Sequence, residues 1–294
     1  MSSVGERLAA FAPSDQSLFG YLFWLSRPRF WLYLAGPVAV GVVYAADSVA
    51  GFFQPLALAL FAWFLVPANL FLYGVNDIFD VDIDAENPKK GEGGREVRYT
   101  GDGIVVMIVY LAGAVGTLFG FALTVEGIYA LAAFYVLAVE YSAPPLRFKT
   151  TPVLDSLSNG LYVLPGVVAY IAIAGESPPL LAVAGGWLWT MGMHTFSAVP
   201  DIEPDREAGI DTTATMLGER WTLVYCGAVW LAAAVLMGLL HPFLGAAFGI
   251  YPVLTLLFAL SEVSVDRAYW WFPVINTVAG ATLSMGGVWV VLYG

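Results

Sequence analysis

The sequence predicts an all-α, polytopic membrane protein with nine transmembrane helices around a central cavity, and three observations lead to this fold class. Hydrophobic residues make up 59% of the 294 residues, whereas charged residues make up only 12%. Soluble domains carry about 25% charged residues, so water is not the expected solvent for most of this chain. Apolar stretches of roughly 20 residues, long enough to cross a bilayer, recur along the whole chain. The third observation is a one-sided distribution of basic residues.

Nine apolar stretches define the expected helices. They cover residues 29–47, 52–75, 103–125, 127–141, 156–174, 179–199, 221–239, 242–261 and 271–293. Several contain proline, which a bundle tolerates because neighbouring helices hydrogen-bond to the freed backbone groups. Frequent Gly and Ala residues allow the helices to approach closely. We expect a single transmembrane domain over residues 1–294, with a cytoplasmic N-terminal segment (1–26) and two cytoplasmic loops (76–102 and 200–220).

The basic residues support this count. When the loops between the expected helices alternate across the membrane, all twelve Lys and Arg residues fall on one side. The other side carries only Asp47, Glu126, Glu176 and His241, in short turns. Because cytoplasmic loops are rich in Lys and Arg, the N-terminus is predicted to be cytoplasmic and the C-terminus extracellular, in a multi-pass protein of the cell membrane.

Charge and cysteine content exclude other classes of protein. The net charge of −11 argues against a nucleic-acid partner, because binding phosphate backbones needs a basic surface. Cys226 is the only cysteine, which excludes an intrachain disulfide and a cysteine metal site. The expected partners are membrane lipids and small molecules that bind at the cytoplasmic face, where nearly all polar residues lie.

An acidic cluster follows the second expected helix. On one continuing helix, Asn76, Asp80 and Asp84 share a face, and Asp77 lies beside them. Like charges at this spacing repel each other unless a cation lies among them, and oxygen ligands suit magnesium. The alternative is a charged helix cap, but carboxylates at a helix C-terminus oppose the macrodipole. We therefore interpret the cluster as a metal site.

A second acidic cluster follows the sixth expected helix. Asp201 and Asp205 repeat the same spacing of four residues. Pro200 and Pro204 disturb a regular helix, because proline removes a backbone donor, so the segment is expected to kink or restart at Asp201. Since helices with even numbers in the predicted order end on the same face, both clusters are expected to converge on one central cavity.

A basic turn separates the two clusters in sequence. Paired prolines are expected to make the segment 141–149 a rigid turn from which Arg147 and Lys149 project. Metals bridging carboxylates to phosphate oxygens, with Lys or Arg completing the contacts, are typical of diphosphate sites. Positive-inside topology explains any single one of these cations equally well. Further candidates are Arg27, Lys89, Lys90, Arg95 and Arg98.

His194 lies near the cytoplasmic end of the sixth expected helix, about two turns before Asp201. A hydrogen-bonded core histidine is favoured over a catalytic base at this position. His241 lies in an outer turn, and a structural role is predicted for it.

Together these motifs resemble those of the UbiA superfamily of intramembrane prenyltransferases, and motif order and topology match over almost the whole chain. The motifs are Asn76-Asp77-x-x-Asp80-x-x-x-Asp84, the turn 141–149, and Asp201-x-x-x-Asp205-x-x-x-Gly209. The resemblance implies a nine-helix bundle whose central cavity opens laterally to lipid. It also implies Mg²⁺-dependent ionisation of an allylic diphosphate, followed by attack of a lipophilic acceptor on the resulting cation.

The resemblance also implies roles for individual residues. The expected Mg²⁺ ligands are Asn76, Asp80, Asp84, Asp201 and Asp205. The expected diphosphate-binding residues are Arg27, Arg95, Arg98, Arg147, Lys149 and Tyr141, with the choice between Arg95 and Arg98 left open. The residues expected to be catalytic are Asp80, Asp201 and Lys149. Asp155 is a candidate for positioning a water molecule.

Within the superfamily, residues 76–90 and 141–160 resemble the carotenoid-elongating branch, the lycopene elongases of salt-loving archaea. The excess of acidic residues, 23 against 12 basic ones, is typical of proteins from such organisms. The branch implies transfer of C5 units from dimethylallyl diphosphate to the ends of lycopene, with water quenching the tertiary cation, on the route to bacterioruberin. Other carotenoid enzymes are further candidate partners.

Other functions stay open from the sequence alone. The loop 89–94 departs from the more basic loop of quinone-directed members, yet a quinone precursor, a chlorophyll-type alcohol or geranylgeranylglyceryl phosphate are alternative acceptors. A transporter would also place acids inside the membrane. It would need polar access from both sides, which the outer loops do not provide.

Overall fold

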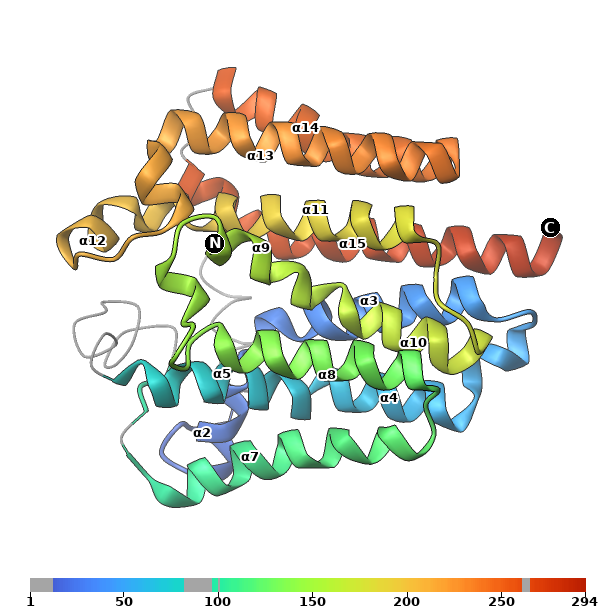
Figure 1. Ribbon diagram of the computed structural model, residues 1–294, viewed down its shortest axis with the longest axis horizontal. Coiled ribbons are helices and arrows are strands. Elements are labelled where there is room, and N and C mark those ends of the chain that lie inside the picture. Colours follow the sequence, from blue (N-terminus) through green and yellow to red (C-terminus); the bar gives the residue numbers. More distant parts are fainter. Residues whose placement is uncertain (1–12, 82–96, 100, 261–264) are drawn as a thin grey trace.

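The computed structural model describes residues 13–81, 97–99, 101–260 and 265–294, and these residues form helices joined by turns. Figure 1 shows the long helices running side by side along the longest axis of the molecule. The longer helices are α2 (Leu18–Leu25), α3 (Trp31–Ala45), α4 (Pro55–Leu65), α5 (Pro67–Phe79), α7 (Gly103–Thr117), α8 (Val125–Glu140), α10 (Leu164–Ala174), α11 (Leu180–Ser197), α13 (Thr213–Leu240), α14 (Pro242–Leu260) and α15 (Val265–Tyr293). The short helical segments are η1 (Pro28–Phe30), η2 (Val49–Phe53), η3 (Leu118–Phe121), η4 (Phe148–Thr150), α9 (Leu154–Leu157), η5 (Ser158–Tyr162), η6 (Val199–Asp201) and α12 (Ile202–Glu207).

The helices lie where the apolar stretches predict them. Within the described part of the chain, six helical stretches are long and apolar enough to cross a membrane. They are Pro55–Phe79, Gly103–Phe121, Leu154–Ala174, Thr213–Leu240, Pro242–Leu260 and Trp271–Tyr293. The helices α3, α8 and α11 also coincide with predicted spans, but α3 and α8 have only 15 and 16 residues. The all-helical architecture is therefore confirmed, and six spans meet the length and composition expected of a multi-pass membrane protein.

Two of the predicted spans are interrupted. The second breaks between α4 and α5, where Val66 leaves helical geometry and Pro67 begins the next helix. Proline suits this first helical position, because its missing N–H would have no intrahelical partner there. The fifth consists of α9, η5 and α10, with Leu164 opening the regular part. Interrupted backbone at membrane depth is tolerated where it is covered by protein.

The acidic segments lie at the same end of the bundle. Figure 1 shows the C-terminal ends of α5, α8, α11 and α14 at its left side, together with the short helix α12 and the N-terminal ends of α7 and α13. The segment 141–149 follows α8 and lies at this end as well. The opposite end carries the turns between α7 and α8, α10 and α11, and α13 and α14.

Close helix contacts depend on glycine. A Cβ atom added at Gly41 of α3 would lie 2.2 Å from the carbonyl oxygen of Gly166 in α10. At Gly245 of α14, a Cβ atom would lie 2.6 Å from the Cα of Gly238 in α13. Only glycine allows backbones to approach this closely. The predicted packing through small residues is therefore confirmed.

The buried apolar residues form two principal clusters. One joins α3, α4, α5, α7, α8 and α10 around residues such as Leu60, Phe64 and Phe134. The other joins α11, α13, α14 and α15 around Phe196, Trp230 and Phe272. Many large apolar side chains on the outer helix faces are exposed, for example Leu111, Leu257 and Met285. Apolar residues on both the inner and outer faces of helices are typical of membrane spans.

The crossing of α3 and α10 predicts the effect of one added methyl group. Gly41→Ala is expected to destabilise the protein by about 1–3 kcal/mol, because the new Cβ atom overlaps the backbone of Gly166. Thermal unfolding of the detergent-solubilised protein measures the effect as a lower Tm. Gly36→Ala in the same helix is the matched control, because no atom lies within 4 Å of its added Cβ atom. Equal Tm values for the two variants would contradict the close crossing.

Candidate functional site

Asp80 is a buried carboxylate held by two cations. It caps the C-terminal end of α5, and its side chain is only 5% exposed. The ammonium group of Lys149 forms an ion pair with Oδ2 of Asp80, and a guanidinium nitrogen of Arg147 lies 3.2 Å from Oδ1. A carboxylate at a helix C-terminus opposes the helix dipole, and burial adds a desolvation cost. The two cations offset the unfavourable helix dipole and the desolvation cost.

Asn76 joins this cluster from one turn earlier in α5. Its Oδ1 accepts hydrogen bonds from the Ser142 hydroxyl at 3.0 Å and from the Lys149 ammonium group at 3.4 Å. The side-chain oxygens of Asn76 and Asp80 therefore share Lys149 as a common neighbour. We name Asn76, Asp80, Arg147 and Lys149 the Asp80 cluster.

The turn 141–149 positions the two cations. The backbone N–H of Lys149 donates to the carbonyl of Tyr141 at 3.1 Å, and Arg147 adopts a left-handed backbone conformation with φ 42°. Arg147 also donates to the carbonyl of Phe79 at 3.4 Å. Its buried Nε has no hydrogen-bond partner among the described residues. The predicted turn is confirmed.

Arg27 forms a second buried ion pair on α5. Its guanidinium lies 3.1 Å from Oδ1 of Asp77, whose side chain is 2% exposed, and 4.6 Å above the ring centre of Tyr73. Arg27 has φ 51°, a left-handed conformation that is unusual outside glycine and aims the side chain at α5. Asp77 and Asp80 therefore bind different cations, although they lie one turn apart.

The second acidic segment restarts as a helix where the prolines predict it. Asp201 ends η6 and occupies the N-cap position of α12, and Asp205 lies within α12. Both side chains are partly buried. The Arg206 guanidinium lies 2.8 Å from Glu203 and donates to the carbonyl of Thr215 at 2.8 Å. The restart fixes the two aspartates on a short helix next to the N-terminal part of α13.

Asp155 connects the two halves of the bundle. It is 1% exposed and accepts hydrogen bonds from the backbone N–H of Thr213 at 3.0 Å and from the Thr213 hydroxyl, at the N-terminal end of α13. An anion is favoured at a helix N-terminus by the unpaired N–H groups and the dipole. His194 of α11 places its Nε2 at 3.9 Å from Oδ2 of Asp155 and at 3.5 Å from the Tyr141 hydroxyl.

Tyr141 lies between this group and the Asp80 cluster. Its ring packs edge-on against His194, with 5.9 Å between the ring centres. A tyrosine phenol has an ordinary pKa of about 10, so the Tyr141 hydroxyl is neutral at physiological pH and can donate a hydrogen bond.

Some predicted site residues are not brought together. Asp84 and Arg95 lie outside the described residues. Arg98 is exposed before α7, where its carbonyl accepts a hydrogen bond from Tyr21 at 3.3 Å. The prediction of one continuous helix through the first motif is wrong, because α5 ends at Phe79 and Asp80 has non-helical backbone angles. The ion pairs with Arg147 and Lys149 hold Asp80 at this break.

The oxygen donors present suit magnesium only in part. Among the described residues, no three His, Cys, Asp or Glu side chains gather closely enough to hold a metal ion. Asn76 and Asp80 nevertheless offer neighbouring oxygen ligands. Magnesium is commonly held by one or two carboxylates together with water and substrate phosphates. The donor set therefore fits a magnesium ion that binds together with a diphosphate.

Sequence reasoning missed several contacts. Ser142 hydrogen-bonds to Asn76, and Thr213 hydrogen-bonds to Asp155. Serine and threonine are too common for their positions in the sequence to indicate such contacts. His194 is packed and hydrogen-bonded within the bundle, as expected of a core histidine. Its partners, Tyr141 and Asp155, could not be identified from the sequence.

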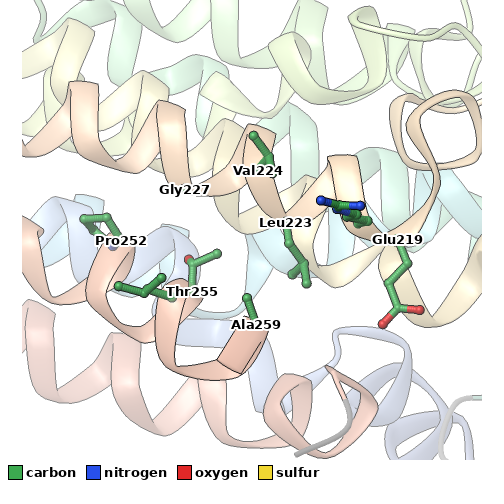
Figure 2. Close-up of a pocket in the computed structure, with 9 residues that line it drawn as sticks. Glu219, Leu223, Val224, Gly227, Pro252, Thr255 and Ala259 are labelled. Carbon is green, nitrogen blue, oxygen red and sulfur yellow. The ribbon is translucent and has the colours of Figure 1, made fainter. Parts of the chain in front are cut away.

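A cavity of about 740 Å³ lies elsewhere, between α13 and α14. Figure 2 shows its lining, in which Leu223 and Thr255 lie on different helices and Glu219 lies at one end. None of the Asp80 cluster lines it. The cavity is largely apolar and lies on the opposite half of the bundle from α5.

Comparison with known proteins identifies relatives over nearly the whole chain. Residues 34–272 match the model of the UbiA prenyltransferase family. The chain is 58% identical over 289 residues to a lycopene elongase/hydratase from Haloarcula japonica, with 98% of each chain covered. It is 60% identical to a lycopene elongase/hydratase from Haloferax volcanii, covering 93% of this chain and 90% of the relative.

Solved structures share the fold. A UbiA homolog from Archaeoglobus fulgidus bound to DMAPP and Mg²⁺ superposes with a TM-score of 0.70, at 18% identity, over 93% of this chain and 99% of that one. The apo structure of a UbiA homolog from Aeropyrum pernix gives a TM-score of 0.59, at 21% identity, over 91% and 98%. At these identities the likeness establishes the arrangement of the helices.

The bonds between Asp155 and Thr213 predict a stability effect. Asp155→Ala is expected to destabilise the protein by about 1–3 kcal/mol, because the buried N–H of Thr213 loses its acceptor. Asp211→Ala is the matched control, since Asp211 is exposed just before the same helix, and it is expected to change stability by about 0.5 kcal/mol or less. Thermal unfolding in detergent compares the two variants, and an unchanged Tm for Asp155→Ala would contradict the capping role.

Proposed function

The chain belongs to the UbiA prenyltransferase family, and we propose that it transfers prenyl groups from dimethylallyl diphosphate to the ends of lycopene, with addition of water, in C50 carotenoid synthesis. The assignment of lycopene as the acceptor rests on the high identity, over nearly the full length, to several relatives named lycopene elongase/hydratase. The enzyme is accordingly a prenyltransferase of the membrane.

Its placement in the membrane follows from charge. We infer nine spans within one domain over residues 1–294, with a cytoplasmic N-terminus and an extracellular C-terminus. The positive-inside rule supports this orientation, since the basic Asp80 cluster and the segments carrying Arg27 and Arg206 lie at one end of the bundle. In this arrangement the diphosphate enters from the cytoplasm, and the apolar acceptor enters from the lipid.

The Asp80 cluster is the proposed diphosphate site. Its two cations and one carboxylate give it a net positive charge. When a diphosphate enters, Lys149 and Arg147 exchange part of their contact with Asp80 for phosphate oxygens, and the buried Nε of Arg147 gains a partner. Arg27 and the neutral Tyr141 hydroxyl flank the site and supply further donors. Of the two other candidates, Arg98 and Arg95, neither is needed for these contacts.

The acidic residues are the proposed metal ligands. The set comprises Asn76, Asp80, Asp84, Asp201 and Asp205. Bound magnesium would neutralise the leaving diphosphate and so favour ionisation of the allylic C–O bond. Within the chain itself, Lys149 and Arg147 compensate the charge of Asp80. The short helix α12, which begins after Asp201 and contains Asp205, lies at the same end of the bundle as the C-terminal end of α5.

Aromatic rings next to Arg27 are suited to shelter the cation. Tyr73 and Tyr162 face each other with 3.4 Å between their hydroxyl oxygens. Tyr33 packs edge-on against Tyr162, with 6.2 Å between ring centres. Aromatic faces attract cations through their quadrupole, and an apolar surrounding delays hydrolysis. These three rings are the candidates for stabilising the allylic cation.

The acceptor is tested directly by product analysis. Membranes containing the protein are incubated with radiolabelled dimethylallyl diphosphate and lycopene, and C45 and C50 carotenoids are expected. Geranylgeranylglyceryl phosphate and a quinone precursor are offered in parallel incubations. Labelling of either of these in place of lycopene would assign the enzyme to a different branch of the family. Absence of any transfer together with ion flux would indicate a transporter.

The metal and its ligands are tested by carboxylate-to-amide substitution. Asp80→Asn and Asp201→Asn are each expected to lower prenyl transfer at least about 100-fold, because an amide cannot neutralise a divalent cation. Glu203→Gln is the matched control, since its side chain is 76% exposed and, within the described part of the chain, pairs only with Arg206. EDTA is expected to abolish activity and excess Mg²⁺ to restore it. Full activity of either aspartate variant would contradict the two-cluster scheme.

A further inference from the structure

His194 joins three elements that meet beside the diphosphate site. It lies on α11, Asp155 lies on α9, and Tyr141 follows α8. The His194 Nε2 is 3.9 Å from the Asp155 carboxylate and 3.5 Å from the Tyr141 hydroxyl. An ionisable ring within an apolar bundle is costly and indicates a functional role.

One of the two tautomers of the ring suits a general base. Both oxygens of Asp155 are engaged by Thr213, so the carboxylate keeps a fixed orientation. With the proton on Nε2, the ring points its donor toward Asp155 and the oxygen of Tyr141. Nδ1 then carries a lone pair and has no hydrogen-bond partner among the described residues. A fixed carboxylate near one ring nitrogen and an open second nitrogen is the arrangement of a general base.

In this arrangement Tyr141 is the residue that connects His194 to the proposed diphosphate site. Tyr141 contacts His194, and its carbonyl accepts the backbone N–H of Lys149, whose ammonium group binds Asp80. The imidazole is partly accessible, with 19% of its side chain exposed, whereas Asp155 is 1% exposed. The ring can therefore meet a small molecule while its orienting carboxylate stays covered.

Addition of water requires such a group, and this step rests on the proposed function. When the allylic carbon joins the terminal double bond of the acceptor, a tertiary cation forms on the acceptor. Water then forms a C–O bond to this cation, and the product is an oxonium ion that must lose one proton to become the neutral alcohol. Without a positioned water and base, the cation instead loses a proton from a neighbouring carbon and becomes an alkene.

We propose that His194 is the general base of the hydration step, with Asp155 as its positioning residue. Nδ1 of His194 orients the water and accepts the proton of the oxonium ion, which yields the neutral tertiary alcohol and an imidazolium ring. The nearby Asp155 carboxylate stabilises the imidazolium while it exists. The proton passes to solvent or to the released diphosphate after the reaction, which returns the ring to its neutral form. Prenyl transfer itself needs no base in this scheme, because the acceptor is an alkene.

The ratio of alcohol to alkene among the products tests the proposal. In His194→Gln, the hydroxylated fraction is expected to fall at least about tenfold and the corresponding alkene to replace it, with total prenyl transfer lowered less than about tenfold. Gln keeps a polar group of similar size, so folding is preserved better than with Ala. His241→Gln is the matched control, because this histidine caps an exposed turn at the opposite end of the bundle. It is expected to leave the product ratio unchanged.

Two further measurements separate catalysis from structure. Product formed in ¹⁸O-labelled water is expected to carry the label in its hydroxyl group for the native enzyme. Added imidazole is expected to restore hydroxylation in His194→Ala, which a purely structural histidine would not allow. An unchanged alcohol-to-alkene ratio in His194→Gln would overturn the proposal. So would a folded variant, able to bind diphosphate, that forms neither product. If the native enzyme extends no lycopene at all, the proposed function fails instead.

Discussion

The buried charge of Asp80 is the constraint on which the site depends. A carboxylate that is 5% exposed at the end of an apolar helix is tolerable only while cations compensate it. Lys149 and Arg147 do so from a turn that is far away in sequence. Removing one partner of a buried ion pair costs about 3–5 kcal/mol, because the other charge is left uncompensated. The same three groups carry an excess positive charge, so the arrangement that stabilises the fold also attracts an anion.

The two acidic motifs belong to different halves of the bundle. The first lies on α5, which packs in the core around Phe64 and Phe134, and the second precedes α13, which packs around Trp230. Asp155 connects the halves, because it lies in the interrupted helix before α10 and bonds to the start of α13. The interrupted backbone from α9 to α10 thus has a structural purpose: it places a carboxylate at this joint.

Much of the fold could be predicted because a bilayer fixes the length of its helices. The positions of α3, α8, α11 and the longer helices follow from runs of apolar residues alone. The breaks at Val66 and between Leu157 and Leu164 could not be predicted in this way, because a helix interrupted within the membrane keeps the same apolar composition. The end of α5 at Phe79 was also missed, since the ion pairs that hold Asp80 there come from a distant turn.

The types of residue in the candidate site could be predicted from the sequence, but the contacts between them could not. Acidic residues with a spacing of four indicated oxygen ligands, and a turn with two prolines indicated a defined position for Lys149, which the structure gives it. The contacts of Arg27 with Asp77, and of His194 with Asp155, join helices whose relative rotation cannot be read from sequence. Periodicity gives the face on which a residue lies, but the neighbour on that face depends on how the whole bundle packs.

The separation of the Asp80 cluster from the His194 group matches the two halves of the reaction. Ionising an allylic diphosphate requires cations near the leaving group, and a base at the same point would be neutralised by them or would bind the metal. In the proposed hydration step, a neutral imidazole next to the Asp155 carboxylate accepts the proton of the oxonium ion. Tyr141 lies between the two groups and contacts His194 with its ring, while its carbonyl bonds to Lys149. One neutral residue thereby contacts the proposed base through its side chain and the segment that carries Lys149 through its backbone.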